Sequence, residues 1–222
     1  MIAPAVLVLP KVKAPGTDRA FLAPAQWQTT ATIHLVRAED GDVAGLPTEV
    51  RLAWSERGLH LHFRCTDPLP LSRDFARDAP IDEEEVVGVF LDPIGERNEY
   101  MAILASPYGR VADARIENPH HHAIGASVDD SWDCTGVRVR SWAYKHEWVV
   151  EMLIPFTGIT PALVPPRPGD RWTGNFYRIE RQPIAEVSAW QPTFQSPVDL
   201  HTSESFGILE FGESLSASDL EL

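Results

Sequence analysis

A tryptophan in a proline-bounded loop follows a strand-like segment that carries an arginine and a glutamate. The stretch reads GNFYRIERQPIAEVSAWQP, residues 174–192, and its notable side chains are Arg178, Glu180 and Trp190. An indole ring can cover the apolar face of a pyranose, while charged groups hydrogen-bond the hydroxyls at the rim of the sugar. Because binding residues concentrate in loops, this arrangement predicts a stacking platform at Trp190 with Arg178 and Glu180 as rim partners.

The segment that positions these charges must have two faces. Alternation over residues 172–180 puts Arg178 and Glu180 on one face of a strand and Asn175 and Tyr177 on the other. Asn175 and Tyr177 join the predicted binding residues if the second face lines the cleft. An alternative stays open, in which Arg178 and Glu180 pair at a sheet rim and Trp190 packs in the core, because tryptophan is usually largely buried.

Acidic residues gather at two other places. Asp82, in the run IDEEE, accepts hydrogen bonds from sugar hydroxyls if it lies beside the Trp190 loop, although a solvated turn is the simpler interpretation for adjacent like charges. Asp129, Asp130 and Asp133 lie within the stretch DDSWD. Calcium takes six to eight oxygen ligands, so these three aspartates form a candidate calcium site, without the ordered spacing of a known calcium loop.

Histidine-based and catalytic motifs are weaker. His60 and His62 share one face of a strand and His120–His122 form a loop run, but third and fourth ligands for zinc or copper cannot be read from the sequence. Paired carboxylates cleave a glycosidic bond only when they lie about 5–10 Å apart, a distance that sequence does not give. No phosphate-binding glycine loop, nucleophile elbow or zinc-protease motif occurs in the chain.

Composition excludes several partners. The 222 residues include 19 basic and 32 acidic side chains, a formal charge of −13, which opposes binding to nucleic acid or to an anionic membrane. No apolar run approaches the ~20 residues that span a bilayer. The N-terminal MIAPAVLVLPK lacks a basic leader, so we expect no signal peptide and, by default, a cytoplasmic protein. Cys65 and Cys134 are expected to be reduced thiols that pack as small apolar residues.

The elements that must position these residues are strands, because alternation with a period of two recurs along the whole chain. The strand candidates are a hairpin within 48–67 and the segments 31–36, 85–92, 99–105, 136–142, 147–155, 172–180 and 206–211. Strands with one apolar face cover it by packing sheet on sheet, so we predict an all-β, antiparallel β-sandwich of the immunoglobulin or jelly-roll type. We expect one domain over 1–211 and a loosely ordered acidic tail over 212–222.

The order of motifs resembles the carbohydrate-binding modules of family 9 and their relatives among the DOMON-like sandwiches. The resemblance covers roughly residues 20–211 and is carried by QW at Trp27, TEVRLAWSERGLHLHFRCTDP, EEEVVGVFLDP, EYMAILASPYGRVADAR, EWVVEMLIPF, GDRWTGNFYRIER, AWQPT and ESFGILEF. It implies non-catalytic binding of a mono- or oligosaccharide in a shallow cleft between two aromatic side chains. It also implies a frequent association with glycoside hydrolases, frequent structural calcium and export from the cell.

The chain departs from the pattern that this resemblance implies at three positions. Trp190 matches one tryptophan of the aromatic clamp, whereas the second tryptophan falls on Asp82. An acidic position of the family falls on Gly88 and an arginine position falls on Leu104. An interaction module with a decayed sugar site is therefore one alternative function.

A haem-binding or redox-linked DOMON-like domain is the other alternative. Met101, Met152 and the histidines would be its axial ligands. Both methionines are more simply explained as core residues, and the chain contains no CxxCH motif.

Overall fold

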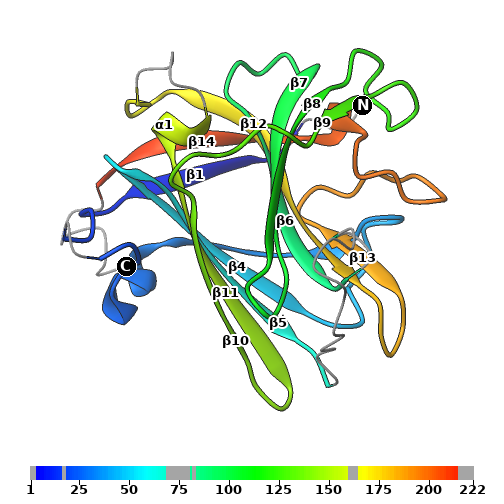
Figure 1. Ribbon diagram of the computed structural model, residues 1–222, viewed down its shortest axis with the longest axis horizontal. Helices are drawn as coiled ribbons and strands as arrows, with labels where there is room; N and C mark the ends of the chain where they lie inside the picture. Colours follow the sequence, from blue (N-terminus) through cyan, green and yellow to red (C-terminus); the bar gives the residue numbers. More distant parts are fainter. Residues whose placement is uncertain (1–3, 17–18, 69–80, 82–83, 160–164, 215–222) are drawn as a thin grey trace.

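The computed structural model describes residues 4–16, 19–68, 81, 84–159 and 165–214, and within these ranges the chain is built almost entirely from strands (Figure 1). The strands are β1 (Val6–Lys11), β2 (Ala31–His34), β3 (Val36–Arg37), β4 (Thr48–Ser55), β5 (Gly58–Thr66), β6 (Val86–Asp92), β7 (Glu99–Ala105), β8 (Val111–Glu117), β9 (Ser127–Asp129), β10 (Arg138–Ala143), β11 (Glu147–Pro155), β12 (Arg171–Glu180), β13 (Glu186–Ala189) and β14 (Gly207–Ser214). The helical elements of the described ranges include α1 (Phe156–Ile159) and the 3-10 turns η1 (Pro24–Thr29) and η3 (Ser203–Ser205). No helix in the described part of the chain is long and apolar enough to cross a membrane.

The strands form two packed layers that are joined along one edge. The hydrogen-bonded order is β10-β11-β5-β4-β1-β14-β12-β6-β7-β8-β9, with β2 on β4 and β13 between β12 and β3. One layer contains β10, β11, β5 and β4, and the other contains β12, β6, β7, β8 and β9. Figure 1 shows the two groups crossing, with β1 and β14 between them. The prediction of an all-β sandwich is confirmed.

The pairing is antiparallel except at β1, which runs parallel to both of its neighbours. Its register joins Val6 to Ile208 of β14, and Lys11 to Trp54 of β4. The ladder is irregular between Leu9 and Lys11, where Pro10 offers no backbone N–H. The sandwich is therefore mixed at this seam rather than antiparallel throughout.

Alternation assigns each strand an inner and an outer face. On β5 the side chains of Leu59, Leu61, Phe63 and Cys65 enter the main apolar cluster between the layers, and the intervening residues His60, His62 and Arg64 point outward. β4 and β11 follow the same pattern, with Val50, Leu52, Val150 and Met152 inside. Met101 also lies in this cluster, so both methionines are buried core residues. The outer face of this layer is left with polar side chains on three adjacent strands.

The second layer has apolar residues on both faces. Val87, Val89 and Leu91 of β6 face the other layer, whereas Phe90 joins Tyr100, Ala102 and Tyr177 in a second apolar cluster on the outer face. β14 continues to Ser214, three residues into the predicted acidic tail, and residues 215–222 lie outside the described residues.

Candidate functional site

Trp190, the predicted stacking platform, is partly buried against the main core. Its indole lies over Gly207, where a Cβ would come within 2.4 Å of the ring atoms Cη2 and Cζ3. Its ring centroid lies 5.8 Å from that of Phe176, and its backbone N–H donates to the Phe176 carbonyl at 2.8 Å. The ring therefore packs against the main core, and its part in binding stays a prediction.

Arg178 and Glu180 do share a face, as alternation predicts, but that face is the core side of β12. Their side chains are 1% and 2% exposed and form a direct ion pair. The Arg178 Nη1 atom also donates to the Thr66 carbonyl at 2.9 Å and to the Thr48 hydroxyl at 3.2 Å. The expectation of a rim position is corrected here, because the apolar residues Trp172 and Phe176 on the same face draw this side of the strand inward.

Arg178 belongs to a buried ionic cluster. Asp67, Glu85 and Glu180 place carboxylate oxygens within 4.8 Å of one another, and this is the group of potential metal ligands found among the described residues. The Arg178 guanidinium lies 3.7 Å from Asp67 and contacts Glu180. The cluster is an ion-pair network that ties β12 to the end of β5.

The aspartates predicted to bind calcium do not form such a group in the described part of the chain. Asp129 is exposed and accepts hydrogen bonds from the backbone and the hydroxyl of Ser131, at 3.1 and 2.6 Å. Asp133 faces the Thr135 hydroxyl at 3.4 Å. Asp130 lies at the edge of a different hollow, described below. Calcium at these residues stays a prediction.

Asn175 and Tyr177 lie on the opposite face of β12 and are buried. The Asn175 amide donates to the Gln191 carbonyl and its oxygen accepts from the Gln191 N–H, both at 2.9 Å, so it anchors the loop after Trp190. The Tyr177 ring covers Gly88, where a Cβ would lie only 2.3 Å from Cζ of the phenol. Asp82, the last of the predicted sugar-binding residues, lies outside the described residues.

Tyr177 also lines an apolar hollow of about 1020 Å³ on the outer face of the second layer. Gly88 pairs with Tyr177 on one side and with Leu104 on the other, so two positions where the family resemblance implies polar ligands lie side by side. The hollow is lined mainly by apolar side chains, among them Phe90, Leu104, Ile116, Ile179 and Leu200. Polar residues also line the hollow, among them Asp113, Arg181 and Asp199.

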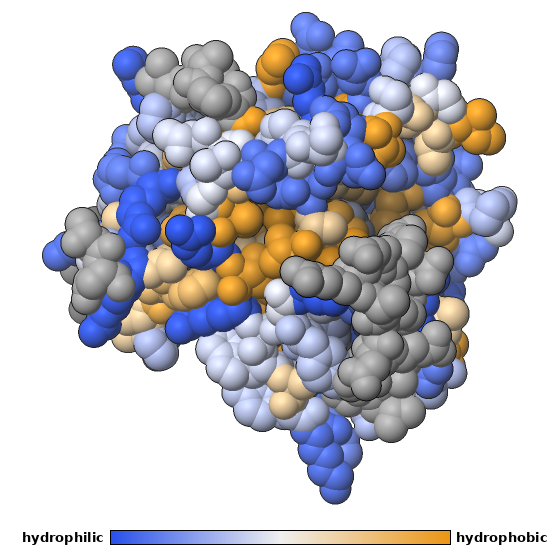
Figure 2. Space-filling model, viewed as in Figure 1, coloured by the Kyte–Doolittle hydropathy of each residue, from blue (hydrophilic) through white to orange (hydrophobic). Residues whose placement is uncertain are grey.

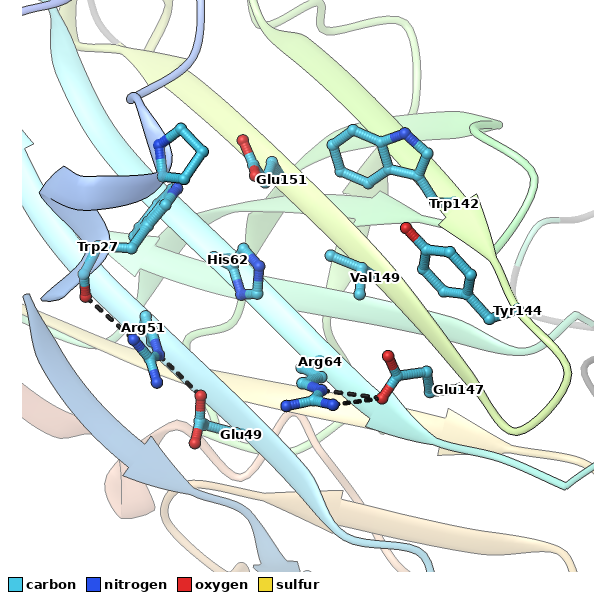
Figure 3. Close-up of a pocket in the computed structure, with 11 residues that line it drawn as sticks. Trp27, Glu49, Arg51, His62, Arg64, Trp142, Tyr144, Glu147, Val149 and Glu151 are labelled. Carbon is cyan, nitrogen blue, oxygen red and sulfur yellow. Dashed lines mark hydrogen bonds and ion pairs between the residues drawn. The ribbon is translucent and has the colours of Figure 1, made fainter.

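A groove of a different character crosses the outer face of the first layer (Figure 3). We call it the aromatic groove. Its volume is about 440 Å³, and it is lined by Pro24, Trp27, Glu49, Arg51, His62, Arg64, Trp142, Tyr144, Glu147, Val149 and Glu151. The floor consists of the outward residues of β4, β5 and β11, because the alternate residues of these strands fill the core.

Aromatic rings stand on both sides of the floor. Trp142 of β10 is 37% exposed and Tyr144, two residues later, is 55% exposed. The Tyr144 N–H donates to the Glu147 carbonyl at 2.7 Å and so prolongs the β10–β11 ladder, which keeps both rings on one face. Trp27 of η1 stands on the other side, with its ring centroid 5.3 Å from that of His62 (Figure 3).

The floor carries paired charges. Arg51 Nε contacts Glu49 at 2.7 Å, and Arg64 contacts Glu147 at 2.8 Å, both within the groove (Figure 3). Glu151 pairs with Arg140 at 2.8 Å. Burial raises the pKa of the Glu151 carboxyl, and the bond to Arg140 opposes that rise. Burial also lowers the pKa of His62, which keeps the imidazole neutral at neutral pH.

A cation contacts the Trp142 ring. The Arg140 guanidinium carbon lies 4.8 Å from the Trp142 ring centroid and 4.3 Å from that of Phe21. Such cation–π contacts fix the orientation of an aromatic ring. The groove therefore combines the ordered indole ring of Trp142 with hydrogen-bond donors and acceptors from the ion-paired side chains. This combination is suitable for binding a polyhydroxylated ring.

Sequence reasoning missed this groove. No binding role was predicted for Trp27 or Trp142, and Tyr144 follows the predicted strand 136–142. A usable signal was nevertheless present. On three strands, polar side chains occupy alternate positions and the remaining positions are apolar. The polar residues are Glu49 and Arg51, His62 and Arg64, and Glu147 and Glu151. Figure 2 shows that hydrophobic residues also gather at the centre of the face viewed there, within a largely hydrophilic rim.

Comparison with known proteins identifies the fold. No family model matches the sequence, and no curated protein matches it. A protein of Bacteroides uniformis ATCC 8492, described as a candidate carbohydrate-binding protein, superposes with a TM-score of 0.73 at 19% identity, over 94% of this chain and 100% of that chain.

Two further solved structures are of a family 9 carbohydrate-binding module from Caldicellulosiruptor kristjanssonii, each at 12% identity and a TM-score of 0.64. The complex with glucose covers 96% of this chain and 97% of its own, and the complex with cellotriose covers 97% and 98%. The resemblance seen in the order of sequence motifs is thus matched in three dimensions over nearly the whole chain. The chain has the β-sandwich fold of the family 9 carbohydrate-binding modules.

Proposed function

We propose that this chain binds a saccharide without transforming it, and that the saccharide lies in the aromatic groove. The observation that carries the proposal is the exposed pair Trp142 and Tyr144 above a floor of ion-paired side chains. The solved structures with the same fold, which include complexes with glucose and cellotriose, support the same class of ligand. In keeping with the family resemblance, we place this binding in polysaccharide breakdown, as an accessory to a glycoside hydrolase.

The arrangement of carboxylates in the groove favours binding over hydrolysis. Glu147 and Glu151 lie on the same face of β11, four residues apart, which is about 13 Å along an extended strand. Glycosidases hold their two carboxyl groups at most ~10 Å apart. Both glutamates are also engaged by arginines, Arg64 and Arg140. These carboxylates are therefore suited to accept hydrogen bonds from hydroxyls.

Tryptophan fluorescence tests the proposal directly. Glucose, xylose, cellobiose and xylobiose are titrated into the wild-type chain and into Trp142→Ala and Trp190→Ala. We expect a saturable change in the wild type and a loss of about tenfold or more in affinity for Trp142→Ala, the scale of a stacking hot spot. A larger loss for Trp190→Ala would move the site to the loop that the sequence first indicated. No response to any sugar at tens of millimolar would overturn carbohydrate binding.

A further inference from the structure

We infer that the aromatic groove selects an uncharged oligosaccharide, with two successive sugar rings stacked on Trp142 and Tyr144. This inference rests on the proposed function and specifies the ligand of the same site. It follows from three features of the groove, namely the spacing of its exposed rings, the cation contact to Trp142 and the balance of its charges.

The two exposed rings form neighbouring platforms along one strand direction. Trp142 and Tyr144 are two residues apart, and the backbone bond from Tyr144 to Glu147 keeps the chain extended between them. Two residues of a strand span ~7 Å, so the rings lie side by side along the edge of the sheet (Figure 3). One six-membered sugar can cover one platform only. A second linked sugar gains the second platform without a further cost of association.

The first platform is preorganised and the second is not. Arg140 is held between the Phe21 and Trp142 rings and is also paired with Glu151. A ring that is already fixed loses little conformational freedom when a ligand stacks on it. Tyr144 is the more exposed of the two rings, and no ring contact or side-chain hydrogen bond is found for it among the described residues. We therefore assign the tighter subsite to Trp142 and the extension subsite to Tyr144.

The charges of the groove favour a neutral ligand. Glu49, Glu147 and Glu151 are each matched by one guanidinium, from Arg51, Arg64 and Arg140 respectively. The imidazole of His62, which also lines the groove, is neutral. The groove therefore carries no net positive charge that would compensate the charge of an anionic sugar. The chain as a whole has a formal charge of −13, which disfavours the approach of uronates or sulfated sugars. Paired donors and acceptors remain able to bond to hydroxyls at the rim.

A length series measures the two subsites. Calorimetric titrations compare glucose, cellobiose, cellotriose and cellohexaose, together with oligogalacturonates of matched length as the charged ligands. We expect a gain of about tenfold or more from one ring to two in the wild type, and at least tenfold weaker binding of the oligogalacturonates. If the glucose series binds poorly, the xylose series of the same lengths takes its place.

Three variants separate the platforms from general effects on the fold. Tyr144→Ala is expected to remove most of the gain in affinity from one ring to two, and Tyr144→Phe to retain that gain. Phe194→Ala, at a 58% exposed aromatic residue outside the groove, is expected to leave every affinity unchanged. Thermal melts of each variant confirm that it is folded.

The outcomes distinguish this inference from the proposed function. Equal affinity for mono- and disaccharides in the wild type, with Trp142→Ala still impaired, would overturn the two-platform arrangement and leave carbohydrate binding in the groove intact. Tight binding of oligogalacturonates would overturn selection for uncharged sugars. A wild type that binds no saccharide at all would overturn the proposed function itself.

Discussion

Replacing Arg178 by methionine tests whether the buried ionic cluster is structural. Methionine keeps much of the apolar stem of arginine but removes the guanidinium, which is 1% exposed. The carboxylates of Glu180 and Asp67, which are 2% and 0% exposed, would then lose the cation that lies between them. The hydrogen bonds to Thr66 and Thr48 are lost as well.

The expected loss of stability is large. Removing one partner of a buried ion pair costs about 3–5 kcal/mol, because the remaining charge stays in a medium that solvates it poorly. Domains unfold with a free energy of about 5–15 kcal/mol, so the expected loss is about a fifth or more of the total. For a chain of this size the midpoint of thermal unfolding would fall by about 6–20 °C.

Urea unfolding followed by tryptophan fluorescence measures this loss. The matched control is Arg171→Met on the same strand, because Arg171 is 60% exposed and pairs with Glu210 at the surface, where such a pair contributes under ~1 kcal/mol. Adding Glu180→Gln to Arg178→Met should recover part of the loss, because it removes a stranded charge. If Arg178→Met stayed within 1 kcal/mol of the control, the structural assignment would be wrong. If it instead weakened sugar binding at unchanged stability, the role first predicted from the sequence would be restored.

Three further outcomes follow from burial. Burial lowers the pKa of His60 from 6.5 to about 4. The unfolded chain therefore binds more protons than the folded chain between these two pH values. The contribution of His60 to the free energy of unfolding is complete above pH 6.5 and falls by up to about 3 kcal/mol as the pH drops to about 4. His60→Gln should flatten this pH dependence in urea titrations at several pH values, and an unchanged slope would assign the acid sensitivity to other groups. Gly88→Ala should cost about 1–3 kcal/mol in the same assay, because the new methyl would meet the Tyr177 ring at 2.3 Å, and a neutral effect would show that the ring moves freely. Burial raises the pKa of Cys65 and of Cys134 to about 12. Neither thiol should therefore react with a disulfide reagent at pH 8 until the chain unfolds. Prompt labelling of the native protein would contradict the burial of the two thiols.

The sequence pattern was sufficient for strands that have one buried face. The hairpin of β4 and β5, and the strands β6, β7, β11 and β12, follow the predicted alternation closely, because burial of one face imposes a period of two. β1 escaped prediction because Pro10 interrupts its apolar run, and a proline usually marks the end of a strand. β8 escaped because its apolar face consists of Ala112, Ala114 and Ile116, and two alanines give only a weak apolar signal.

The candidate site was harder to predict than the fold. Alternation showed that Arg178 and Glu180 share a face, but it could not show that this face is the interior, although Trp172 and Phe176 beside them indicated as much. The aromatic groove depends on the register between β4, β5, β11 and β10, which brings together residues that are a hundred positions apart, such as Arg51 and Glu151. Nothing local in the sequence encodes that register.

The parallel pairing of β1 with β14 sets the order in which this domain can mature during synthesis. The partners of Val6–Lys11 are residues 208–214, so β1 can complete its pairing only after β14 has been synthesised. Contacts of such high sequence separation slow folding, and until they form, β1 has an open strand edge that other chains can pair with. Co-translational folding of this domain can be completed only after residue 214 has emerged, and a nascent chain stalled before Gly207 would depend on chaperones to protect that edge.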